Sequence, residues 1–74
     1  VLSIVEAGQQ KSIELLQNMR EKMLRIQDST LTSDQRQSLL DQLTELKSEL
    51  TDIYNSVTYI LFILITLLTL HIDP

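Results

Sequence analysis

Residues 32–53 read TSDQRQSLLDQLTELKSELTDI, and this stretch predicts a long amphipathic helix. Thr32 stands three residues before Gln35, which is the spacing of a capping box, and Asp34 falls in the first turn, where the helix dipole favours an anion. Ser33 is an equally acceptable cap. Apolar residues then alternate three and four positions apart, which places them along one face of the helix. Seven residues keep this register: Leu39, Leu43, Leu46, Leu50, Ile53, Val57 and Ile60.

An earlier stretch, from about Leu2 to Gln27, predicts another amphipathic helix. Gly8 weakens the prediction locally, because a glycine inside a helix costs ~1 kcal/mol relative to alanine. The apolar pattern is correspondingly weak before Ile13 and firm after it. Its predicted contact face, or seam, consists of Leu2, Val5, Gln9, Ser12, Leu16, Met19, Met23 and Ile26.

Between the two predicted helices lies DSTLTS, residues 28–33, whose short polar side chains compete with helical hydrogen bonds and favour a turn. A connection of roughly five residues makes the flanking helices antiparallel neighbours. We therefore predict an all-α fold, an antiparallel helical hairpin of coiled-coil type whose long second helix runs into an apolar C-terminal segment. Leu15, Leu24 and Leu40 fall outside both predicted seams, so we expect a third or fourth helix to cover them.

The composition changes abruptly near residue 56. Fifteen of the 16 Asp, Glu, Lys and Arg residues precede it, and the 20 residues from Ile53 to Ile72 carry no formal charge. We accordingly divide the chain into an amphipathic hairpin, residues 1–56, and an apolar tail, residues 57–74. At ~1.5 Å per residue the uncharged run is long enough to cross a hydrocarbon layer of ~30 Å. Three interpretations stay open: a continuing helix with an apolar end, a membrane anchor, and an out-of-frame tail.

Composition also restricts the function. The net charge of −4 disfavours nucleic acid, the absence of cysteine excludes disulfides and thiolate metal sites, and His71 alone cannot build a zinc site. No Ser-His-Asp arrangement, phosphate-binding glycine loop or calcium loop is present. We expect neither an enzyme nor a cofactor. The seam of the second helix is longer than the first helix can cover, because Val57 and Ile60 extend past the point where Leu2 and Val5 pair weakly. We expect this exposed part of the seam to cause self-association, and the opening at Val1 suggests a fragment or a processed product.

Three segments together resemble a known family. They are LQNMRE at residues 16–21, DSTLTSDQR at residues 28–36 and LKSELTDI at residues 46–53. Their order and ungapped spacing resemble the N-terminal conserved region of bacterial flagellins, which typically reads LQRMRELAVQ, NGTLTDEDR and LKxEIDRI. The resemblance covers about residues 2–55. The flagellar hook–filament junction protein shares much of the same pattern and is a close alternative.

The resemblance implies a secreted structural subunit of the bacterial flagellum that works in motility by packing helices against neighbouring subunits. The residues expected to pack are Leu16, Met19, Met23, Ile26, Leu39, Leu43, Leu46, Leu50 and Ile53. Arg20 and Glu21 match part of a motif that an innate immune receptor recognises in many flagellins, although Asn18 and Lys22 depart from it. The segment that the family places after Asn55 is replaced by the apolar tail. The alternative function is a small tail-anchored membrane protein whose hairpin binds a partner helix.

Overall fold

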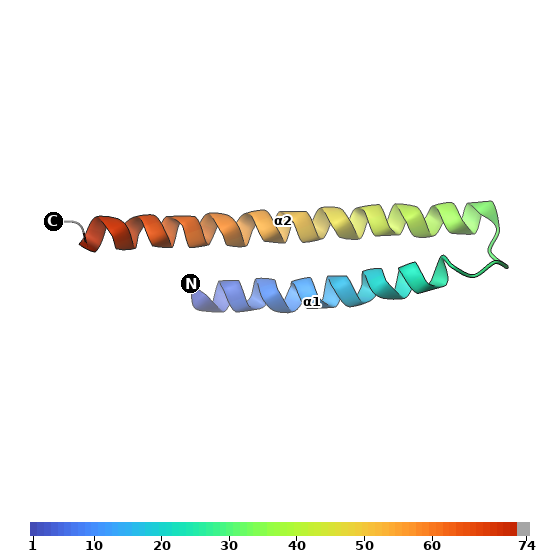
Figure 1. Cartoon of the computed structure of the whole chain (residues 1–74), viewed down its shortest axis with the longest axis horizontal. Coiled ribbons are helices and arrows are strands. Elements are labelled where there is room, and N and C mark those ends of the chain that lie inside the picture. The colour runs from blue at the N-terminus through green and yellow to red at the C-terminus, as the bar shows by residue number, and fades with distance from the viewer. Residues whose placement is uncertain (73–74) are drawn as a thin grey trace.

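The computed structural model describes residues 1–72, and within them it contains two helices and no strand. Helix α1 spans Leu2–Arg25 and helix α2 spans Ser33–Ile72. The two lie side by side and antiparallel, and α2 extends well beyond the start of α1 (Figure 1). The resulting rod measures 66 × 16 × 13 Å. The predicted all-α hairpin with a long second helix is confirmed.

Helix α1 ends two residues before the predicted boundary. The Ile26 amide still donates to the Lys22 carbonyl at 3.0 Å, whereas the Gln27 amide donates to Leu24 at 3.3 Å, a tighter turn that closes the helix. Lys22 and Arg25 lie in the last turn, where their positive charges complement the helix dipole.

The connection between the helices spans residues 26–32 and is held by two side chains. Asp28 Oδ1 accepts from the Thr30 backbone N–H at 2.9 Å and from the Thr30 hydroxyl at 2.7 Å. These two donors, with help from the positive charge of Arg36, hold the pKa of the Asp28 carboxyl below its ordinary value. From the first turns of α2, Arg36 donates to the Ile26 carbonyl and, at 3.4 Å, to the Asp28 carbonyl. Arg36 therefore ties the start of α2 to the end of α1.

Helix α2 begins with the predicted capping box. The Gln35 amide donates to the Thr32 hydroxyl at 3.1 Å, and the Thr32 amide donates to the Gln35 side-chain oxygen at 2.9 Å. Each side chain thus satisfies one amide that the helix itself cannot pair. The helix then continues without a break to Ile72, past the compositional boundary drawn at Ser56. Asp73 and Pro74, which end the predicted apolar tail, lie outside the described residues.

The seam of α2 is the predicted one. Leu39 and Leu46 are buried, at 7% and 9% exposed. The other five predicted seam residues are partly buried, unlike the polar residues between them: Leu43, Leu50, Ile53, Val57 and Ile60.

The predicted seam of α1 is wrong at alternate positions. Residues 5, 12, 19 and 26 face α2 as expected, but the positions between them are Gly8, Leu15 and Lys22, and not Gln9, Leu16 and Met23. Leu2, the first residue of the predicted seam, is 74% exposed. Leu15 is 4% exposed, so the expectation that it needs a further helix is also wrong. Either register buries one leucine, Leu15 or Leu16, so the two registers differ mainly at the N-terminal end of α1. The observed one leaves the Gln9 amide hydrated, which avoids the cost of burying an unpaired polar group.

Gly8 sets how closely the helices approach at the N-terminal end of α1. A methyl group added at Gly8 would stand 2.8 Å from Val57 Cγ2 and 3.5 Å from Ile53 Cγ2. Side chains at this position would therefore push α1 away from α2. The glycine that weakened the helix prediction is thus explained by packing. The expectation that Val57 extends beyond the first helix is wrong, because Val57 lies inside the paired region.

The paired region ends near residue 63 of α2. Because Gly8 lies opposite Val57 and the helices are antiparallel, Leu2, six residues before Gly8, lies level with about Ile63. The last eight helical residues, Ile65–Ile72, continue beyond α1, as Figure 1 shows. We call this segment the overhang. Five of its apolar side chains are 58–70% exposed, namely Ile65, Leu67, Leu68, Leu70 and Ile72.

Candidate functional site

The surfaces available for packing lie on both helices. On α1, Leu16 and Met23 are 52% and 53% exposed, so neither belongs to the contact between the two helices. Leu24, one residue further along, is 60% exposed and continues this outer face of α1. The hairpin therefore leaves an apolar surface uncovered within the segment that resembles flagellin.

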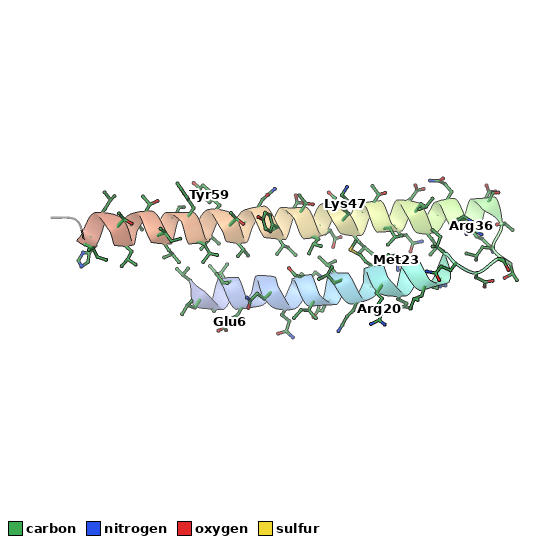
Figure 2. The ribbon with its side chains drawn as sticks, in the orientation of Figure 1. Glu6, Arg20, Met23, Arg36, Lys47 and Tyr59 are labelled. Atoms are coloured by element: carbon green, nitrogen blue, oxygen red, sulfur yellow. The ribbon has the colours of Figure 1, made fainter. Side chains whose placement is uncertain are left out.

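The remaining predicted packing residues divide between the helices. Met19 and Ile26 are partly buried against α2, together with the α2 seam residues already described. Arg20 and Glu21 are exposed, and Arg20 is directed away from α2 (Figure 2). The hairpin thus brings Met19, Ile26 and the α2 seam together and leaves Leu16, Met23, Arg20 and Glu21 outside. A role for any of these residues between subunits stays a prediction.

The ionisable side chains form no metal-binding group. Among residues 1–72, no three His, Cys, Asp or Glu side chains are placed so that they share a metal ion. Buried polar side-chain atoms without a hydrogen-bond partner are likewise absent from this part of the chain.

A groove runs along one side of the contact between α1 and α2. The small side chains of Gly8 and Ser12 form its α1 wall, and the Ser12 hydroxyl donates to the Gly8 carbonyl at 2.7 Å. No Asp, Glu, Lys or Arg lines the groove. The lining residues are Gly8, Gln9, Ser12, Ile13, Leu50, Ile53, Tyr54, Val57, Thr58 and Leu61. The sequence analysis missed this groove, although two small residues four positions apart on a helix were a signal for it.

Helix α2 is also long and apolar enough to cross a membrane. An 18-residue window in it has a mean hydropathy of 1.9, and none of that window is buried inside the structure. The hairpin limits how much of α2 is free for this purpose. Because Gly8 lies opposite Val57 and the helices are antiparallel, Glu6 lies level with about Tyr59, and Lys11 lies level with about Tyr54. These charges would accompany residues 54–59 into a hydrocarbon layer.

Only Leu61–Ile72 are therefore available for insertion while α1 stays paired. Twelve residues measure about 18 Å along a helix, which is shorter than the ~30 Å of a hydrocarbon core. A full crossing by α2 requires the first turns of α1 to leave it.

No protein-family model, curated protein or solved structure matches the chain. The resemblance to flagellins therefore rests on the three sequence segments alone.

Proposed function

We propose that the chain is a structural, non-catalytic helix-packing unit, and that its hairpin serves as a flagellin-like subunit segment in a bacterial flagellar filament. The observation that carries this proposal is the uncovered outer face of α1. Leu16 and Met23 are more than half exposed in the hairpin, and Leu16 opens the first of the three flagellin-like segments. Apolar side chains that a hairpin leaves in water are suited to packing against a neighbouring subunit.

Assembly with flagellin tests the proposal. The full chain is mixed with bacterial flagellin monomers during seeded polymerisation, and the filaments are pelleted and imaged by negative-stain electron microscopy. The amount of chain in the pellet is compared with the chain centrifuged alone. We expect the chain to enter or cap the filaments. A chain that stays in the supernatant while flagellin polymerises normally would contradict the proposal.

Two variants make the test specific to the outer face of α1. The double variant Leu16→Gln, Met23→Gln should remove co-pelleting while leaving the hairpin folded, because both side chains are already exposed in it. Leu70→Gln is the matched control, since Leu70 is 69% exposed but lies outside the flagellin-like segment. Equal co-pelleting of the double variant and the control would show that this face of α1 is not the packing surface.

A second candidate function is that of a membrane-anchored protein whose hairpin binds a partner helix, and the apolar length of α2 favours it. Alkaline carbonate extraction of membranes from expressing cells tests this candidate. An anchored chain stays with the membrane pellet, whereas release into the supernatant excludes a span. Because a full crossing would separate the first turns of α1 from α2, amides near Gly8 should then exchange hydrogen faster than in the hairpin.

A further inference from the structure

A second apolar surface, distinct from the seam, follows one flank of α2 from the groove into the overhang. It repeats every four and three residues and therefore stays on one side of the helix. Tyr54, Leu61, Ile65, Leu68 and Ile72 are 69%, 41%, 65%, 59% and 70% exposed, and Thr58 is exposed as well. We call this set the outer stripe: Tyr54, Thr58, Leu61, Ile65, Leu68 and Ile72.

The two halves of the outer stripe differ in their surroundings. Its first three residues, Tyr54, Thr58 and Leu61, form one wall of the groove beside α1. Its last three belong to the overhang, which has no helix beside it. The same stripe thus provides an empty groove at one end and an uncovered apolar ridge at the other. A continuous helix cannot bend back to place its own ridge in its own groove.

The spacing of the outer stripe is the same in both directions, since its steps are four, three, four, three and four residues. Two antiparallel copies of α2 related by a twofold axis at the level of residue 63 therefore match position for position. Tyr54 meets Ile72 of the second copy, Thr58 meets Leu68, and Leu61 meets Ile65. Such a self-complementary contact is what twofold symmetry between identical chains requires.

We propose that the chain forms an antiparallel dimer in which the overhang of each copy fills the groove of the other. The lengths agree. The groove runs from Leu50 to Leu61, about 17 Å along α2, and the overhang is about 12 Å long. The chemistry agrees as well, because neither the groove lining nor the overhang contains an Asp, Glu, Lys or Arg.

The surface area of the single chain is large enough for this contact. A compact protein of 8.5 kDa exposes about 4,700 Å², whereas this chain exposes 6114 Å². The excess of roughly 1,400 Å² exceeds the ~800 Å² that each partner buries in a standard specific interface. A second copy therefore brings the exposed surface towards that of a compact protein.

Cysteine cross-linking tests the arrangement, since the native chain contains no cysteine. Chains carrying Leu61→Cys are mixed with chains carrying Ile65→Cys, unfolded and refolded together, and then oxidised. Antiparallel pairing predicts that the mixed disulfide exceeds either disulfide between identical chains. Dominant self-linking of the Leu61→Cys chain would indicate parallel pairing and overturn the proposal. Absence of all cross-links, together with a monomeric mass by sedimentation, would also overturn it.

Two neighbouring leucines provide a matched pair of variants. Leu68 is 59% exposed and lies on the outer stripe, whereas Leu67 is 58% exposed and lies on the other flank of α2. Leu68→Asn should raise the dimer dissociation constant by at least about tenfold, because each dimer loses two buried leucines, and Leu67→Asn should leave it unchanged. Equal effects of the two variants would overturn the proposed face. Circular dichroism checks that both variants keep their helix content.

Small-angle scattering gives an independent result. Ser33 lies 30 residues from the twofold axis in each copy, so the antiparallel dimer should be about 90 Å long, against 66 Å for one chain. A dimer no longer than the single chain would overturn the proposal. Transfer of monomers without cross-links into phosphatidylcholine vesicles would also overturn the proposal, because the overhang would then bind lipid and not a second copy.

The dimer uses residues 50–72 and α1 near Gly8, whereas the flagellin-like packing proposed above uses Leu16 and Met23. The two proposals are tested separately by the two sets of variants. Leu68→Asn should lose the dimer and keep filament binding, whereas Leu16→Gln, Met23→Gln should lose filament binding and keep the dimer.

Discussion

The charged half of α2 and its uncharged overhang differ in burial, and the difference is opposite to the one that hydropathy alone predicts. In the charged half, residues 33–53, Leu39 and Leu46 are 7% and 9% exposed. In the uncharged overhang, Leu70 and Ile72 are 69% and 70% exposed. The more apolar overhang is thus less buried than the charged half. Burial along α2 is decided by the reach of α1 and not by the apolar content of α2.

The largest expected effect comes from weakening the packing of α1 against α2. Leu15 is the most deeply buried side chain of α1, at 4% exposed. Leu15→Ala should lower the free energy of unfolding by ~2–5 kcal/mol, because it removes buried methyl groups and leaves a cavity between the helices. Chemical denaturation followed by circular dichroism measures the change.

Two controls accompany this variant. Leu16→Ala and Leu70→Ala remove the same atoms from side chains that are 52% and 69% exposed, and each should change the free energy by less than ~0.5 kcal/mol. If Leu16→Ala proved as costly as Leu15→Ala, the register of α1 described above would be wrong.

A smaller effect is expected at Gly8, where α1 approaches α2 beside the groove. Gly8→Ala improves helix propensity by ~1 kcal/mol but forces a methyl group to 2.8 Å from Val57 Cγ2, and overpacking of this kind costs ~1–3 kcal/mol. We expect a net loss of about 1 kcal/mol, measured from thermal or denaturant melts.

The combination with Val57→Ala identifies the cause. In that background the clash is absent, so Gly8→Ala should become stabilising through its helix propensity. A loss of stability that is the same in both backgrounds would mean that the approach of α1 to Val57 does not determine the effect.

The stability of the first turn of α2 depends on the capping box. Thr32→Ala removes the hydroxyl that accepts from the Gln35 amide at 3.1 Å and should cost about 1 kcal/mol. Thr32→Ser keeps an acceptor in the same place and should restore most of the stability. Melts of the two variants give the comparison, and equal losses would exclude the cap as the cause.

The smallest effect concerns pH and the connection. The pKa of Asp28 is lowered in the folded chain by the Thr30 amide and hydroxyl, so its stabilising contribution is present above the ordinary aspartate pKa of about 3.9 and is lost as the pH falls through the lower folded value. The difference in Tm between the native chain and Asp28→Asn should therefore shrink below about pH 4. A difference that stays constant from pH 7 to pH 2.5 would contradict this assignment.

The sequence predicted α2 better than α1 for a physical reason. In α2, Leu39 and Leu40 are adjacent, but polar and charged residues separate the apolar residues that follow, so Leu43, Leu46 and Leu50 fix a single register. In α1, Leu15 and Leu16 are adjacent, as are Met23 and Leu24, and two faces fit almost equally well. The close approach at Gly8 distinguishes them, but that requirement depends on Val57, 49 residues away in the chain.

Among the candidate surfaces, the overhang followed from the unequal lengths of the predicted helices. The groove did not, because it depends on which small residues of α1 stand beside which residues of α2. The turn and the capping box were predictable because their hydrogen bonds join residues only two or three positions apart.

The contacts of Arg36 have a consequence for proteolysis. Trypsin must bind an arginine side chain before it cleaves the following peptide bond, and the Arg36 guanidinium is engaged by the carbonyls of Ile26 and Asp28. Arg25 makes no comparable contact across the connection and lies exposed in the last turn of α1. Cleavage after Arg36 therefore requires the connection to release its own arginine. Because the Arg36–Gln37 bond also lies within α2, the rate of cleavage after Arg36, relative to cleavage after Arg25, reports opening of the connection together with unwinding of the first turns of α2.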